Sequence, residues 1–324
     1  MWKFILRRIL VMIPQLFILS VLVFTLAKAM PGDALSGAEL ANPKADPKVI
    51  EEQREKLGLN DPIPTQYVRW ISNAVQGDFG ISYAHKIQVT DIIGERLGNT
   101  VLLALLILIL ILTYLIAIPL GVISGRWNDT WADRLITLYN FLGFGTPLFI
   151  FGLVMLFLFG FLYPIFPTSG SVDPQVAAGS FDYYLSKLNH MILPALSGAL
   201  IGTVGTVQYL RSEIIDTKHK DFVRTVKAKG VPESKVYSRH ILRNSFLPIA
   251  AFLGYEITGL VGGSIILENI FGYPGIGQLF FQSITQRDFS VVTALVLFTG
   301  FATLLGTLLS DIILSIVDPR IRID

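Results

Sequence analysis

Six long apolar stretches, separated by segments in which charged residues gather, constrain the fold of this chain more than any other feature. Only 15% of the 324 residues are charged, whereas a soluble domain has about 25%. Because about 20 apolar residues in a helix cross the hydrocarbon core of a bilayer, each stretch can span a membrane. The six stretches are residues 9–26, 101–123, 135–162, 191–210, 246–267 and 289–311. The sequence therefore predicts an all-α integral membrane protein with six transmembrane helices.

The first stretch also resembles a secretion signal, because Lys3, Arg7 and Arg8 precede it. The apolar core of a cleaved signal is only about 7–15 residues long. The uncharged run from Ile9 to Leu26 is longer than that. We therefore expect residues 1–30 to form a retained membrane helix.

The distribution of Lys and Arg predicts which segments face the cytoplasm. Both chain ends are basic, and the loop 211–245 is the most basic segment between two apolar stretches. Cytoplasmic loops of membrane proteins carry an excess of Lys and Arg. The sequence thus places both termini and the loop 211–245 in the cytoplasm, and residues 31–96, 163–190 and 270–288 outside. Within the second external segment, the Pro- and Gly-rich residues 163–187 predict a loop.

The first external segment, residues 31–96, has the features of a folded region. Residues 47–57 and 63–74 have helical character, and Tyr67 and Trp70 lie at helical spacing in the second of them. The segment could form a lid or a docking face for an external partner. It could equally be a solvated spacer with interfacial helices.

The residues that most enzymes and metal sites need are missing from the sequence. There is no cysteine, which excludes disulfides and thiolate nucleophiles, and the four His stand at no metal-like spacing. A phosphate-binding loop is excluded because the chain has no Gly-Lys pair, and the H-E-x-x-H and G-x-S-x-G motifs are absent. A net charge of +2 gives no argument for nucleic acid. We expect no catalytic residue, metal or cofactor in this chain, so another protein would supply energy for uphill transport.

The segment from Asp221 to Pro248 combines basic charge with helix signals. Residues 221–229 predict a short helix, Gly230 suits a left-handed stop, and Pro232 can open a second helix. We therefore expect a helix, a tight turn and a second helix before the chain re-enters the membrane at Phe246. A structured basic loop of this kind is typical of a docking site. An ordinary solvated loop that only sets orientation fits the same pattern.

Glu256 is the single charged residue in the stretch 246–267. A carboxylate at mid-depth costs about 2.5–3.5 kcal/mol on insertion scales, so its side chain should face protein or water instead of lipid. It could line a translocation path, contact a partner subunit, or be protonated and hydrogen-bonded inside the bundle. Gly259 and Gly263 on the same stretch favour close packing of helices.

A turn is predicted directly after this stretch, at residues 268–277. Pro274 and Gly275 impose a reversal of the chain, and Phe271 and Tyr273 suit the aromatic belt at a membrane surface. A simple turn at the membrane edge explains the pattern without any special function.

Two of these motifs resemble those of a known family. Residues 223–230, VRTVKAKG, resemble the EAA loop in permease subunits of bacterial ABC importers, in the form found in the dipeptide, oligopeptide and nickel group. The matching residues are Arg224, Thr225, Ala228, Lys229 and Gly230, with Val226 where Ala is usual. The second motif, E-x-x-F-x-x-P-G-x-G, is matched by Glu268, Phe271, Pro274, Gly275 and Gly277. Leu247-Pro248 and the runs 30–33 and 77–83 also fit the B-type subunit of oligopeptide importers.

The resemblance implies the fold of a type I ABC importer permease. Residues 97–318 would form the core permease domain, and the loop 211–245 would contain a short coupling helix that lies in a groove of an ATPase. The partners would be a homologous second permease, two cytoplasmic subunits that bind ATP and Mg, and an external solute-binding protein. The chain would then pass peptides, either dipeptides or oligopeptides, across a bacterial cytoplasmic membrane by alternating access.

Other classes remain open at this point. A secondary transporter driven by an ion gradient often shows inverted repeats and two broken helices, whereas this sequence shows no repeat and one Gly-interrupted span. A receptor or assembly scaffold would bind without transport. Within the resembled family, a permease for nickel or another metal chelate is the alternative to a peptide permease. Peptide is favoured because the sequence lacks a His, Cys and Asp cluster.

Overall fold

The protein is a set of helices, seen in a computed structural model. The structure describes residues 2–29, 51–52, 54–55, 58–82, 84–105, 108–246, 249 and 264–317, and it has no strand within these ranges. Glu256, the pair Leu247-Pro248 and most of the predicted stretch 246–267 lie outside the described residues. The expectations for them therefore stay predictions.

The helices follow one another with short connections. In the first half of the chain they are α1 (Trp2–Ala29), α4 (Ile63–Val75), α5 (Val89–Leu105), α6 (Leu108–Arg126), α7 (Trp131–Gly145), α8 (Leu148–Leu156) and a π-helix (Phe157–Leu162). In the second half they are α9 (Phe181–Lys218), α10 (Asp221–Ala228), α11 (Glu233–Lys235), a second π-helix (Val236–Ile241), α12 (Leu242–Ser245), α14 (Ile265–Ile270), α15 (Ile276–Thr285) and α16 (Phe289–Val317).

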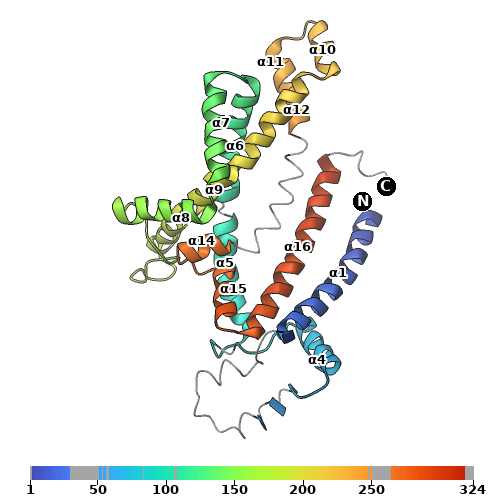
Figure 1. Ribbon diagram of the computed structural model, residues 1–324, viewed down its shortest axis with the longest axis vertical. Coiled ribbons are helices and arrows are strands. Elements are labelled where there is room, and N and C mark those ends of the chain that lie inside the picture. The colour runs from blue at the N-terminus through green and yellow to red at the C-terminus, as the bar shows by residue number, and fades with distance from the viewer. Residues whose placement is uncertain are drawn as a thin grey trace.

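Two groups of helices form the body of the molecule (Figure 1). Helices α6, α7 and α9 pack together, and α1 packs along α16. Helices α10 to α12 lie at the same end of the molecule as the start of α1 and the end of α16, whereas α4 lies at the opposite end (Figure 1). The basic segment and the two chain ends are thus on one side of the helix bodies.

Three helices in the described part of the chain are long and apolar enough to cross a membrane. They cover Ile5–Ala29, Phe181–Lys218 and Phe289–Ile312, and they overlap the predicted stretches 9–26, 191–210 and 289–311. The predicted stretch 101–123 corresponds to the end of α5 and most of α6. Within the described ranges, the structure therefore supports a membrane protein built of helices.

The stretch 135–162, expected as one span, is two helices. Helices α7 and α8 with its following π-helix meet at 101°, and the break falls at Thr146 and Pro147. Thr146 has an extended backbone with φ −103° and ψ 112°, because the ring of a following proline disfavours the helical region. Pro147 also lacks an N–H for the helical hydrogen bond. Figure 1 shows α8 turned away from the bundle axis.

Helix α9 is longer at both ends than the sequence predicts. It begins at Phe181, where the Ser180 side chain accepts a hydrogen bond from the Tyr183 N–H at 3.1 Å, so the predicted loop at residues 163–187 is wrong for its last part. The helix continues through Pro194 to Lys218. Serine caps of this kind satisfy an otherwise unpaired helix N–H. The first part of the expected loop 211–245 is therefore helical.

Two glycines allow α6 to pack directly against α9. A Cβ atom on Gly121 would lie 2.9 Å from Leu210 Cβ, and one on Gly125 would lie 2.7 Å from Ile214 Cβ. Both distances are below van der Waals contact, so only glycine permits this approach. A small residue at every fourth position is a known means of bringing helix backbones together.

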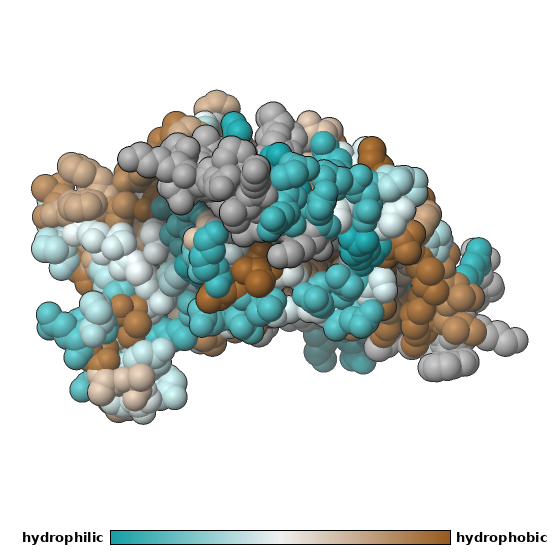
Figure 2. Space-filling model, turned by 90° about the horizontal axis from the view of Figure 1, so that it is seen from below, coloured by the Kyte–Doolittle hydropathy of each residue, from teal (hydrophilic) through white to brown (hydrophobic). Residues whose placement is uncertain are grey.

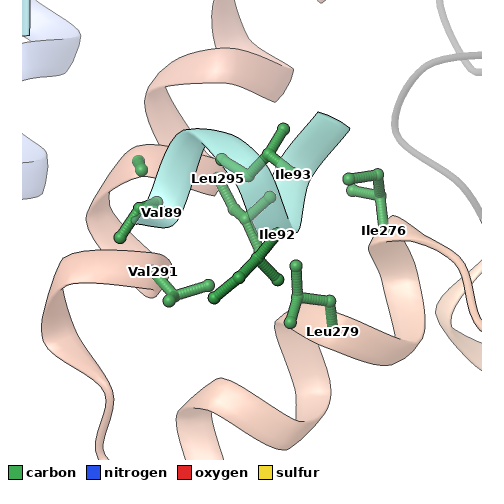
Figure 3. Close-up of a cluster of buried hydrophobic side chains, with 8 residues drawn as sticks. Val89, Ile92, Ile93, Ile276, Leu279, Val291 and Leu295 are labelled. Carbon is green, nitrogen blue, oxygen red and sulfur yellow. The ribbon is translucent and has the colours of Figure 1, made fainter. Parts of the chain in front are cut away.

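Hydrophobic packing closes the opposite end of the molecule (Figure 3). Val89, Ile92 and Ile93 of α5 contact side chains of α15 and α16 in one buried cluster. Beside it, the buried Asp288 carboxylate accepts a hydrogen bond from the Ser82 hydroxyl at 2.5 Å. The residues that precede α5 are thereby tied to the turn between α15 and α16.

The surface at this end differs from its surroundings. Among the residues drawn in colour, hydrophilic ones gather over the middle of the face and hydrophobic ones lie at its two flanks (Figure 2). Polar residues at the end of a helix bundle and apolar residues around it are the pattern of a membrane protein.

Replacing Gly125 by Ala should destabilise the protein by about 1–3 kcal/mol, the usual cost of overpacking. The added methyl group would force α6 away from Ile214. The matched control is Gly205→Ala in α9, where no atom lies within 4 Å of an added Cβ. Thermal unfolding in detergent should show a lower midpoint for Gly125→Ala alone, and equal midpoints would contradict the close contact.

Candidate functional site: the basic helix-turn-helix and the Glu268 turn

Helix α10 is short and presents two different faces. Val223 is buried and Val226 is half-buried, both against the bundle. The motif residues Arg224, Thr225 and Ala228 are exposed, as are Lys229 and Gly230 that follow the helix. The predicted contact residues thus face outward, whereas Val226 packs inward.

Local signals explain why so few residues form a helix here. Asp221 lies in the first turn and Lys227 in the last, which suits the charges to the helix dipole. The Thr225 hydroxyl also donates a hydrogen bond to the Asp221 carbonyl at 3.0 Å. The ion pair between Arg224 and Asp221 is 3.7 Å long, with side chains 75% and 98% exposed, so it contributes little to stability.

Gly230 ends the helix as the sequence predicts. Its φ is +73°, in the left-handed region that favours glycine, and its N–H donates to the Lys227 carbonyl at 3.0 Å. No atom lies within 4 Å of an added Cβ. The backbone conformation, and not lack of space, therefore requires glycine here.

A hydrophobic cluster fixes the helix-turn-helix to the bundle. Leu210 and Ile214 of α9 and Tyr114 of α6 form this cluster with Val223 of α10 and Val236 of the second π-helix. Its fully buried members exclude water from the contact. A displacement of α10 would therefore be transmitted to α6 and α9.

A buried ion pair joins the α6–α7 turn to α9. Arg211 Nε and Nη2 donate to the two Asp133 carboxylate oxygens at 2.7 and 2.8 Å. The Asp133 carboxylate also accepts hydrogen bonds from the Ser124 hydroxyl and the Asp129 N–H. Bidentate pairs of this kind fix geometry as well as adding energy.

Two further cations link the same turn to the helix-turn-helix. Lys218 Nζ donates to the Gly125 and Arg126 carbonyls at 2.8 and 3.2 Å, and so satisfies the last carbonyls of α6. The Arg126 guanidinium lies 4.8 Å from the ring centroids of both Trp127 and Tyr237. Burial raises the pKa of Tyr237 to about 12, so its ring stays neutral beneath the cation.

Replacing Arg211 by Met should destabilise the protein by about 3–5 kcal/mol, because it leaves the buried Asp133 carboxylate without its partner. Arg134→Met is the matched control, since Arg134 is exposed on the same turn. Thermal unfolding in detergent should separate the two variants. If the midpoint of Arg211→Met equals that of the control, the ion pair has no structural role.

The second motif folds around the fully buried Glu268. Glu268 Oε2 accepts a hydrogen bond from the Gln278 N–H at 2.8 Å, and Oε1 accepts one from the Thr100 hydroxyl at 3.1 Å. Thr100 Oγ1 in turn accepts from the Ile276 N–H at 2.7 Å. Glu268 and Thr100 together satisfy N–H groups in the first turn of α15, which the helix itself cannot pair.

The remaining motif residues make this arrangement possible. A Cβ on Gly275 would lie 2.5 Å from Glu268 Cδ, and one on Gly277 would lie 2.7 Å from the Ile265 nitrogen. Phe271 is buried against α8 and α9, and the Pro274 carbonyl accepts from Asn99 Nδ2 at 3.0 Å. The pattern E-x-x-F-x-x-P-G-x-G thus encodes a capped turn that joins α5, α14 and α15.

Sequence reasoning missed several of these contacts. It found the motif residues, but it assigned no partner to Glu268 and did not select Thr100, Asp133 or Arg211. A lone Asp and a lone Arg next to two apolar stretches was the available signal. Their pairing depends on which helices are neighbours, which one sequence does not show.

The structure offers no metal site in the part of the chain that it describes, since no group of three or more His, Cys, Asp or Glu gathers there. The predicted residues fall into two places. The helix-turn-helix carries Arg224 to Gly230, and the turn carries Glu268 to Gly277. Glu256, the candidate for a translocation path, is outside the described residues.

Replacing Glu268 by Ala should cost about 1–3 kcal/mol for each buried donor left unpaired. The control is Glu95→Ala, because Glu95 is an exposed acid on α5. Trypsin digestion of membrane vesicles should cleave the Glu268→Ala protein faster near Arg287, which follows α15. Equal digestion of both variants would argue against a stabilising cap.

Comparison with known proteins agrees with these features. Residues 117–323 match the family model described as "Binding-protein-dependent transport system inner membrane component", and residues 1–106 match its N-terminal companion. The oligopeptide transport system permease protein AppB of Bacillus subtilis (strain 168) is 39% identical over 99% of this chain and 100% of its own length. The glutathione transport system permease protein GsiC of Escherichia coli (strain K12) is 35% identical over 99% of each chain.

The chain therefore belongs to the family of inner membrane components of binding-protein-dependent transport systems. Its resemblance to the permeases of the dipeptide, oligopeptide and nickel group is confirmed by the full-length relatives. These relatives are named as permeases, which are transport components and not enzymes.

Proposed function

We propose that this chain is a permease subunit of an ATP-driven ABC importer for peptides, and that α10 is its ATPase-coupling helix. One observation carries the proposal. Helix α10 exposes Arg224, Thr225 and Lys229 while its other face is fixed to α6 and α9 through Val223. An exposed, rigid, basic helix of this kind suits a groove lined by acidic groups on a partner.

The coupling follows from the contacts around α10. A partner that binds ATP and changes shape would push on the exposed face of the helix. The shared hydrophobic cluster and the pair between Arg211 and Asp133 would carry that push to α9 and the α6–α7 turn. A bound nucleotide can shift the transporter between inward- and outward-facing states only through such differential contacts.

The proposed topology has six transmembrane helices with both termini and α10 in the cytoplasm. The shared end for α10, the start of α1 and the end of α16 supports it (Figure 1). The proposed partners are a homologous second permease, two cytoplasmic ATPases that bind ATP and Mg, and an external solute-binding protein. Membrane lipid surrounds the assembly.

Peptide is the proposed solute because the relatives transport oligopeptides and glutathione by name. Glutathione is itself a small peptide, so both names share one chemical class. Glu256 is proposed to lie on the translocation path, as a carboxylate in an apolar stretch should face water or protein. Replacing the external binding protein, and not this chain, would then change the preferred peptide length.

Replacing Arg224 by Glu should weaken ATPase binding roughly tenfold, since the reversed charge would repel an acidic groove. Arg224 contributes little to folding, because its only ion pair is solvent-exposed. The measurement is retention of ATPase subunits during purification of the tagged complex, followed by peptide uptake into vesicles. Lys187→Glu is the control, at the opposite end of α9.

Two outcomes would contradict the proposal. Full retention and full ATP-driven uptake by Arg224→Glu would show that α10 is not the coupling helix. Peptide accumulation by this chain reconstituted alone with an ion gradient would show a secondary transporter. The first outcome leaves an ABC permease in place, whereas the second removes it.

A further inference from the structure

Helix α4 has a wider apolar face than its contact with α1 requires. With 100° between successive residues, Tyr67, Trp70 and Ile71 share one side of the helix. Val68 and Val75 lie on an adjoining strip and are 61% and 82% exposed. This strip is not covered by any described residue to a degree that would bury it.

Aromatic side chains attach α4 to α1. The Tyr67 ring lies 5.4 Å from the Phe24 ring centroid and 6.4 Å from that of Phe17. Tyr67 Oη is 2.8 Å from the Ser20 hydroxyl oxygen, and the Trp70 ring lies 5.6 Å from Phe24. The position of α4 along α1 is therefore fixed by several contacts.

These contacts place α4 at a defined depth along α1. The uncharged run of α1 ends at Leu26, and Lys28 is the next charged residue. Ser20 precedes Leu26 by six residues, about 9 Å along a helix axis. The hydroxyl of Tyr67 thus reaches below the polar boundary of the apolar span, and α4 lies at that boundary.

The exposed strip continues a surface that already faces lipid. On α1, Leu22 and Leu26 are 54% and 65% exposed, in a helix that is apolar enough to cross a membrane. The other side of α4 is polar, and there Arg69 Nη2 pairs with Asp61 Oδ2 at 2.7 Å. Asn73 is exposed on the same polar side.

We propose that α4 is an interfacial helix, whose strip at Val68 and Val75 is inserted among the lipid headgroups and upper acyl chains of the outer leaflet. A helix with one apolar and one polar face binds a bilayer surface in this way, and Tyr67 and Trp70 suit the aromatic belt at that depth. In this arrangement α4 holds the external end of α1 at a constant level in the membrane, while the polar side of α4 faces water. The proposal does not depend on the solute.

The absence of cysteine from the chain allows a direct test. Single cysteines at Val68 and, as the matched control, at Asn73 are labelled with an environment-sensitive fluorophore in the assembled transporter. The complex is reconstituted into vesicles of phosphatidylcholine and phosphatidylglycerol, with nitroxide lipids labelled near the headgroup or at the acyl-chain end. The Val68→Cys label should emit at shorter wavelength, be quenched by the shallow nitroxide more than by the deep one, and resist iodide. The Asn73→Cys label should respond to iodide alone.

Two other results would overturn the proposal. If both labels are quenched by iodide and neither by nitroxide lipids, α4 stands in water. If the Val68→Cys label resists iodide and both nitroxides, protein covers the strip. A further variant separates insertion from folding, because a label at Val75→Cys should lose its nitroxide quenching in the Val68→Asp background and keep it in the Asn73→Asp background.

Discussion

The close approach of α6 to α9 is the contact on which the rest of the structure depends. Gly121 and Gly125 remove the side chains that would separate the two helices. Helix α9 has 38 residues, about 57 Å of continuous helix, and it reaches from the Glu268 turn to the helix-turn-helix. Because it is one helix, contacts made at its two ends share one rigid element.

Charged residues divide into two groups according to their surroundings. Asp133, Arg211, Lys218 and Glu268 are committed to hydrogen bonds that close helix ends and turns. The charges of α10, by contrast, are exposed and make only a long ion pair with each other. The first group therefore stabilises the fold, and the second is suited to contact another protein.

Part of this arrangement was predictable from local sequence. Gly230 predicts the end of α10 because a positive φ favours glycine, and the helix at residues 63–74 is found at Ile63–Val75. The break between α7 and α8 was not predicted, although Thr146-Pro147 was a signal for it. Hydropathy alone favoured one span there, because both halves are apolar. The helical start of α9 was missed because the Pro- and Gly-rich residues before Ser180 dominated the pattern.

The sequence by itself determined the membrane class, the basic segment and the two motifs, because apolar length, charge distribution and turn residues are local properties. The tertiary structure alone decided which groups meet. It joined Thr100 to Glu268, Asp133 to Arg211, and the aromatic residues of α4 to those of α1. Such pairs are far apart in the chain, and only the packing of the helices brings them within hydrogen-bond or ring-contact distance.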